Sequence, residues 1–196
     1  MKHGIDIEPV EFSTNLSFPL EVRVNGRGGQ GGVTCAKIIS MLFARMGYYV
    51  QTFGDYGSER TGAPIQAFTR ADSKPISNRN KVYQPDHLIV FDDQLFGMNI
   101  LAGVNPGATV LINSDQEIDS FAERFADYHL GVIDATRVAR RHKIGTSSLV
   151  IINTTIVGAY ARLLGIPMSV LESVYQGIGL ISNQDAAREA FDHVAI

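Results

Sequence analysis

The sequence of 196 residues contains a single cysteine, Cys35. No disulfide can therefore form within the chain, and one thiolate cannot hold an iron–sulfur cluster, which needs about four. Basic residues are not in excess, because 17 lysines and arginines stand against 20 acidic residues and give a net charge of −3. The chain thus lacks the broad positive field of proteins that bind nucleic acid or anionic lipid. We expect neither a nucleic-acid nor a membrane partner.

Targeting signals and metal-binding spacings are also missing. The first residues contain no apolar stretch typical of a secretory signal. The uncharged run at residues 144–161 carries six Ser, Thr and Asn side chains, whereas a membrane-spanning helix needs about 20 mainly apolar residues. The five histidines are scattered, with no metal-like spacing to one another or to Cys35. We therefore expect a cytoplasmic chain without a metal site of its own.

Apolar residues recur with the period of strands and helices in turn. Strands are predicted at residues 20–25, 48–53, 65–70, 87–91, 109–112 and 131–134. Helices are predicted at residues 36–46, 92–101, 118–125, 155–164, 167–175 and 186–194. Strands that alternate with helices favour an α/β fold. We predict a single Rossmann-like three-layer domain at residues 20–196, with a mostly parallel sheet and a helical C-terminal part, preceded by an N-terminal arm at residues 1–19.

A glycine loop follows the first predicted strand and fits the pattern G-x-G-x-x-G. In dinucleotide-binding proteins such a loop brings the backbone close to the pyrophosphate, and an acidic residue after the next strand holds the ribose. Here Arg27 and Gln30 place polar side chains among the glycines, and Asp55 comes 24 residues after Gly31, inside a loop. An autonomous NAD- or FAD-binding oxidoreductase is therefore one alternative. An α/β binding module, whose glycines only form a tight turn, is another.

Three other features have simpler explanations. Cys35 lies just after the glycine loop in a predicted helix, where a buried, inert thiol is the favoured interpretation. Asp92 and Asp93 follow a buried strand, where they suit the start of a helix. The basic cluster at residues 137–143 is typical of a solvated helix face.

Two loops taken together are more specific than either alone. The glycine loop is followed by a second loop that reads Tyr-Gly-Ser-Glu-Arg-Thr-Gly-Ala-Pro over residues 56–64. This pair resembles the gamma subunit of 2-oxoacid:ferredoxin oxidoreductases, with the pyruvate type (pyruvate synthase) as the nearest match. The similarity continues through the Asn-Thr-Thr-Ile-Val-Gly-Ala segment that begins at Asn153, and through Gly-Ile-Pro at residues 165–167. It covers roughly residues 20–194.

The resemblance implies a multi-subunit enzyme. Such complexes decarboxylate a 2-oxoacid on thiamine diphosphate and Mg²⁺, pass electrons through iron–sulfur clusters to ferredoxin, and transfer the acyl group to coenzyme A. The resemblance assigns thiamine diphosphate to the alpha and beta subunits and the clusters mainly to the delta subunit. A gamma subunit is then expected to bind no cofactor alone, to be inactive alone, and to serve assembly with a coenzyme A-facing surface. Pyruvate is the favoured 2-oxoacid.

The resemblance also implies a site, without assigning any catalytic residue to this chain. The two loops are expected to bind a cofactor or to contact a partner subunit. Their residues are Gly26, Arg27, Gly28, Gly29, Gln30, Gly31, Tyr56, Gly57, Glu59, Arg60, Thr61 and Gly62. Arg27 and Arg60 carry planar donor groups that suit a carboxylate or a phosphate. If the loops follow adjacent strands at their carboxyl ends, they share one crevice.

Overall fold

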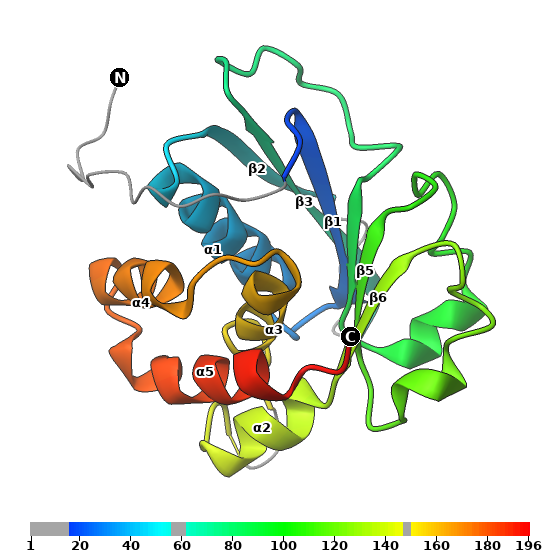
Figure 1. The fold of residues 1–196 in the computed structure, drawn as a ribbon, viewed down its shortest axis with the longest axis vertical. Coiled ribbons are helices and arrows are strands. Elements are labelled where there is room, and N and C mark those ends of the chain that lie inside the picture. The colour runs from blue at the N-terminus through cyan, green and yellow to red at the C-terminus, as the bar shows by residue number, and fades with distance from the viewer. Residues whose placement is uncertain (1–15, 56–61, 147–149) are drawn as a thin grey trace.

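The computed structural model describes residues 16–55, 62–146 and 150–196 (Figure 1). Its strands are β1 (Leu20–Arg27), β2 (Tyr49–Asp55), β3 (Pro64–Asp72), β4 (His87–Val90), β5 (Thr109–Asn113) and β6 (His129–Ile133). Its α-helices are α1 (Gly32–Arg45), α2 (Ala135–Arg141), α3 (Thr155–Leu163), α4 (Met168–Gly177) and α5 (Gln184–His193). Short 3₁₀ helices are η1 (Asp93–Gly97), η2 (Ile118–Ser120) and η3 (Ile181–Asn183).

The described strands form one sheet of six strands in the order β2-β3-β1-β4-β5-β6. The neighbouring pairs β1–β4, β4–β5 and β5–β6 are parallel. β3 is antiparallel to both β1 and β2, so it runs against the other strands. This arrangement confirms the predicted α/β class with a mostly parallel sheet.

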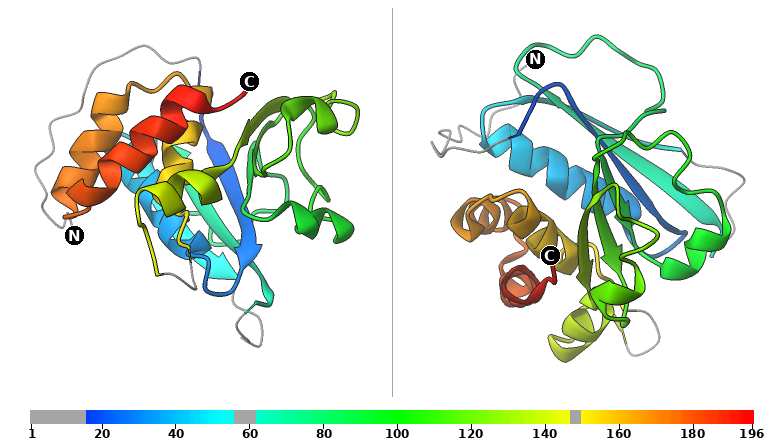
Figure 2. Two further views of the ribbon diagram at one scale, coloured as in Figure 1. Left: turned by 90° about the horizontal axis from the view of Figure 1, so that it is seen from below. Right: turned by 45° about the vertical axis from the view of Figure 1, so that its right-hand side comes forward.

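Strand β4 is buried on both faces of the sheet. Ile89 packs into a core formed with α1, α3, α4 and α5, whereas Leu88 and Val90 pack into a second core with η1 and η2. Figure 2 shows the α-helices on one side of the sheet and the segments that contain η1 and η2 on the other. A strand covered on both faces has no polar alternation, which explains its continuous apolar run.

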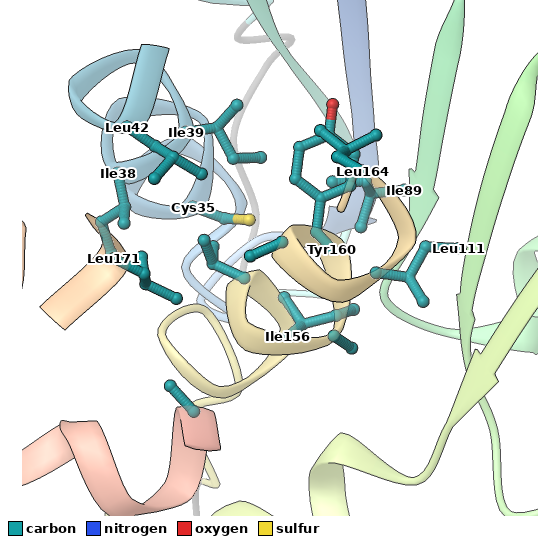
Figure 3. Close-up of a cluster of buried hydrophobic side chains, with 14 of the residues drawn as sticks. Cys35, Ile38, Ile39, Leu42, Ile89, Leu111, Ile156, Tyr160, Leu164 and Leu171 are labelled. Carbon is teal, nitrogen blue, oxygen red and sulfur yellow. The ribbon is translucent and has the colours of Figure 1, made fainter. Parts of the chain in front are cut away.

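The larger core lies between one face of the sheet, α1 and the C-terminal helices (Figure 3). Cys35, Leu42 and Tyr160 are completely buried there. α3 and α5 approach each other closely at Gly158, where an added Cβ would lie only 1.9 Å from the backbone oxygen of Ala187. The helical C-terminal part is thus integral to the domain, because it covers one face of the sheet.

Two predicted helices are wrong in type. Residues 92–101 form only the 3₁₀ segment η1 followed by turns, and residues 118–125 form η2 followed by turns. Phe96 and Phe125 nevertheless reach the second core, with ring centroids 5.3 Å apart. One short turn is enough to bury these rings, and a segment this short gains little from helical cooperativity.

The segment before β1 packs on the domain where it is described. The Phe18 ring stacks on Tyr48 with centroids 3.7 Å apart, and Leu16 and Phe18 contact the larger core. Most of the proposed arm, residues 1–15, lies outside the described residues, so the boundary at residues 19 and 20 stays a prediction. Within the described parts of the chain, no helix combines the length and apolarity needed to cross a bilayer.

Candidate functional site

The glycine loop connects β1 to α1 with a sharp turn. Gly29 and Gly31 both have positive φ, and Gly31, at φ +86°, stands directly before α1. A Cβ at Gly31 would lie 2.6 Å from the amide nitrogen of Asn153. Glycine is therefore needed at Gly31 both for the left-handed backbone and for the close approach of the segment before α3.

The two polar side chains of this loop are bound within the protein. The Gln30 Oε1 accepts a hydrogen bond of 2.7 Å from the backbone N–H of Arg27. The Arg27 Nε donates to Asp92 Oδ2 at 2.5 Å, and the other Asp92 oxygen accepts from the backbone N–H of Gln94. Asp92 caps η1, as its position after a strand predicts, and it also fixes Arg27. Sequence reasoning missed this second role, because the two residues are 65 positions apart.

The ends of the two motif loops meet. The Gly28 N–H donates to the Ala63 oxygen at 2.8 Å, and the Gly62 N–H donates to the Gly28 oxygen at 3.2 Å. These bonds continue the β1–β3 ladder, in which Arg27 stands opposite Pro64. The strands that precede the loops are not adjacent, because β3 lies between β1 and β2. The loops come together because β3 begins beside the end of β1.

Much of the second motif loop lies outside the described residues. This applies to Tyr56, Gly57, Glu59, Arg60 and Thr61. Their predicted roles in cofactor binding or subunit contact stay predictions. Gly62 is described, and its φ of +90° is a conformation that favours glycine.

Polar residues follow β4, β5 and β6 at the carboxyl end of the sheet, which is the lower end in Figure 1. They surround a cleft of about 320 Å³, here named the acidic cleft. It is lined by Gln30, Phe91, Asp92, Asp93, Asn113, Ser114, Asp115, Asp134, Thr136, Arg137 and Arg140. Ser114 Oγ donates to Asp93 Oδ2 at 2.6 Å. The signal for this cleft was present in the sequence as a polar residue directly after each buried strand.

This geometry disfavours a dinucleotide site. β3 separates β1 from β2, so the acid that would hold a ribose does not come from a neighbouring parallel strand. Asp55 instead forms an ion pair with Lys81. Gln30 already occupies one backbone donor of the glycine loop, and four aspartates line the adjacent cleft. Arg137 and Arg140 also line this cleft, and Arg137 pairs with Asp134.

Cys35 and one of the histidines, His87, are parts of the core. Cys35 is completely buried, as the sequence predicts, and burial raises the pKa of its thiol. His87 Nδ1 and the Tyr160 hydroxyl share a buried hydrogen bond of 2.6 Å. Burial lowers the pKa of His87 to about 4, so the imidazole is neutral at pH 7. Within the part of the chain that the structure describes, no three His, Cys, Asp or Glu residues are grouped to hold a metal ion.

Comparison with known proteins decides the family. The family model for pyruvate ferredoxin/flavodoxin oxidoreductase matches residues 21–193. The chain belongs to this family. A relative from Thermococcus kodakarensis, the common gamma subunit of pyruvate/ketoisovalerate oxidoreductases, is 37% identical over 187 residues, which are 90% of this chain and 98% of the relative. The pyruvate synthase subunit PorC of Methanothermobacter thermautotrophicus is 33% identical over 181 residues, which are 89% of this chain and 96% of that subunit.

A solved structure agrees with the fold. The pyruvate oxidoreductase subunit PORC from Thermotoga maritima superposes with a TM-score of 0.75 at 28% sequence identity, and covers 90% of this chain and 97% of that one. The resemblance seen in the two motif loops is therefore confirmed. The chain is a gamma, or PorC, subunit of a 2-oxoacid:ferredoxin oxidoreductase, and it works as part of a multi-subunit complex.

Proposed function

We propose that this gamma subunit organises a complex that oxidises pyruvate to acetyl-coenzyme A, with ferredoxin as electron acceptor. In this proposal the alpha and beta subunits hold thiamine diphosphate and Mg²⁺, and the delta subunit holds iron–sulfur clusters. The gamma subunit has no turnover alone. It contributes a surface that contacts a partner subunit and faces coenzyme A.

The observation that carries this proposal is the meeting of the two motif loops. Gly28 hydrogen-bonds to Ala63 and Gly62, and Asp92 holds the guanidinium of Arg27 beside them. The Arg27 Nη1 also lies 3.5 Å from the Gly62 oxygen. Since side chains that are fixed in advance lose little entropy on binding, this surface is suited to recognition.

The chain's own thiol supports the division of labour among subunits. An iron–sulfur cluster needs about four thiolates, and this sequence has only Cys35, which lies inside the larger core. The residues present do not fit a cluster. Electron transfer to ferredoxin is therefore assigned to other subunits in our proposal.

The test is co-expression of this chain with its partner subunits, comparing Arg27→Ala with Arg79→Ala. Arg79 is exposed on the segment between β3 and β4 and serves as a matched control for the loss of one arginine. We expect Arg27→Ala to reduce recovery of the complex on size exclusion, or to raise the KM for coenzyme A at least about tenfold, because a charge-assisted hydrogen bond contributes about 1.5–3 kcal/mol.

Thermal unfolding of the isolated chain shows whether Arg27→Ala remains folded. A folded variant that assembles fully and has an unchanged KM for coenzyme A would refute the role of this surface. Arg60→Ala is expected to behave like Arg27→Ala, since Arg60 belongs to the second motif loop.

Acceptor reduction with pyruvate and with 2-ketoisovalerate decides the substrate, and we expect pyruvate to have the higher kcat/KM.

A further inference from the structure

Strand β2 forms one outer edge of the sheet, here named the β2 edge, and pairs with β3 alone among the described strands. None of its seven residues is fully buried, whereas residues 67–71 of the neighbouring β3 are all buried. Apart from the ladder with β3, the backbone of β2 forms no hydrogen bond to the described residues. Every second residue of an outer antiparallel strand directs its N–H and C=O away from the sheet, so the β2 edge offers a row of backbone donors and acceptors.

The β2 edge lacks the features that usually keep an outer strand from pairing. Natural sheets protect such strands with lysine, proline, a β-bulge or a covering segment. β2 reads Tyr-Val-Gln-Thr-Phe-Gly-Asp, with no lysine or proline, and only its last residue is charged. Its register with β3 runs without a bulge from Tyr49 to Asp55. Since the sequence is rich in residues that favour strands, this edge suits a further strand.

The opposite edge of the sheet, formed by β6, is covered by the chain itself. Val132 of β6 and Ala195, near the end of the sequence, form an antiparallel bridge. The N–H of each residue donates to the oxygen of the other at 2.9 Å. A terminal segment that returns to pair with an outer strand is therefore already part of this fold.

The N-terminal part of the chain meets the domain beside the β2 edge. The Phe18 ring stacks on Tyr48, which directly precedes the first residue of β2. A chain traced backward from Phe18 therefore starts at the beginning of β2 and can follow this strand in the antiparallel direction. The segment before Phe18 also precedes residues 21–193, which the family model matches, so its role is not given by the family.

The sequence of this N-terminal segment contains a strand pattern. Residues 5–8 read Ile-Asp-Ile-Glu, which alternates apolar and acidic side chains with the period of a strand, and Pro9 favours an extended backbone in the residue before it. Ile5 precedes Phe18 by 13 positions. An extended chain of that length spans about 40 Å, whereas a strand as long as β2 spans about 23 Å. Residues 5–8 can therefore reach any part of the β2 edge.

We propose that residues 5–8 pair with the β2 edge as a seventh, outer strand, antiparallel to β2. Ile5 and Ile7 lie on the helical side of the sheet, next to Val50, which packs on the larger core. The acidic side chains at positions 6 and 8 face the other side and protect the new outer strand from further pairing. A segment of the same chain is present at an effective concentration on the order of millimolar, which favours it over a second copy or a partner subunit. The pairing is independent of the proposed function, because neither motif loop takes part.

The experiment measures amide hydrogen exchange, by ¹H–¹⁵N spectra for the full chain at two protein concentrations and by mass spectrometry for the co-expressed complex. Ile7→Pro is the test variant, because proline removes a ladder N–H. Ser13→Pro is the matched control, which places a proline in the same segment outside residues 5–8. A chain without residues 1–12 is a second test variant that keeps Phe18. We expect the outward amides of β2 to exchange at least about tenfold faster in Ile7→Pro and in the shortened chain, since several backbone hydrogen bonds are lost. In Ser13→Pro they should exchange as in the unaltered chain, and amides of β6 should be the same in all variants.

Three results would overturn the pairing of residues 5–8 with β2. The first is fast exchange of the outward β2 amides in the unaltered chain, or equal protection in the unaltered and shortened chains. The second is protection that grows with protein concentration, which would identify a second copy at the β2 edge. The third is protection that appears only in the co-expressed complex, which would identify a partner subunit there. None of these results affects the proposed gamma function, which Arg27→Ala tests separately.

Discussion

Alanine in place of glycine should have four different effects on stability at four positions. Two independent costs are involved, a positive φ and a close neighbour. Gly177 in α4 has neither, since no φ in the left-handed range and no atom within 4 Å is found there. Gly165 has φ +67° and no neighbour within 4 Å. Gly158 has only the neighbour, at 1.9 Å, and Gly31 has φ +86° together with Asn153 at 2.6 Å.

The expected magnitudes follow from these environments. Alanine at Gly177 should stabilise the protein by up to about 1 kcal/mol, because glycine loses more backbone entropy on folding. Alanine at Gly165 should destabilise it by about 1–2 kcal/mol, the cost of a left-handed backbone. Alanine at Gly158 should cost about 3 kcal/mol or more, because the Cβ meets backbone that cannot rotate away. Alanine at Gly31 combines both costs, with a side chain as the neighbour, and should cost about 3 kcal/mol.

Urea unfolding followed by circular dichroism measures these differences from the midpoints and slopes. The reasoning depends on the order of the four variants, in which Gly177→Ala is the most stable and Gly158→Ala and Gly31→Ala are the least. A Gly158→Ala protein as stable as Gly177→Ala would show that α3 and α5 do not approach this closely. A Gly31→Ala protein no less stable than Gly165→Ala would show that Asn153 does not press on the start of α1.

Three further predictions concern single side chains. Since burial lowers the pKa of His87 to about 4, the unfolded chain takes up its proton first as the pH falls. The free energy of unfolding should therefore drop by about 3 kcal/mol between about pH 6.5 and pH 4. Chemical unfolding of His87→Gln should lack this loss. The control variant His193→Gln, which alters an exposed histidine, should still show it. Asp92→Asn should cost about 1 kcal/mol in urea unfolding by weakening its pair with Arg27, and an unchanged midpoint would contradict that contact. Cys35 should react with a thiol reagent in urea but not in the native protein, and fast native labelling would contradict its burial.

The order of most strands and helices was predictable because local pattern and burial agree there. β4 is apolar from Leu88 to Val90 because both of its faces are covered. As expected, α3 ends just before Gly165 and α4 begins directly after Pro167. The segments at 92–101 and 118–125 were predicted wrongly as α-helices, since their apolar spacing fits one helical turn. How far such a turn continues depends on the rings of Phe96 and Phe125 packing in the second core.

The candidate site was only partly predictable. The two motif loops were found from their glycines and charged residues, and the family they indicate is confirmed. The partners of those residues were not found. Arg27 is fixed by Asp92, and Gly31 is constrained by Asn153, 122 positions further along the chain. The acidic cleft likewise combines residues that follow three separate strands.

The sequence by itself determined the α/β class, the family, and the exclusion of a disulfide or a cluster held by this chain. These properties depend on local periodicity, on specific motifs and on the number of thiols. Only the tertiary structure decided that β3 lies antiparallel between β1 and β2, and that this placement joins the two motif loops. It also gathered the polar residues that follow three separate strands into one cleft. Such features depend on contacts between residues far apart in the chain, which no local pattern records.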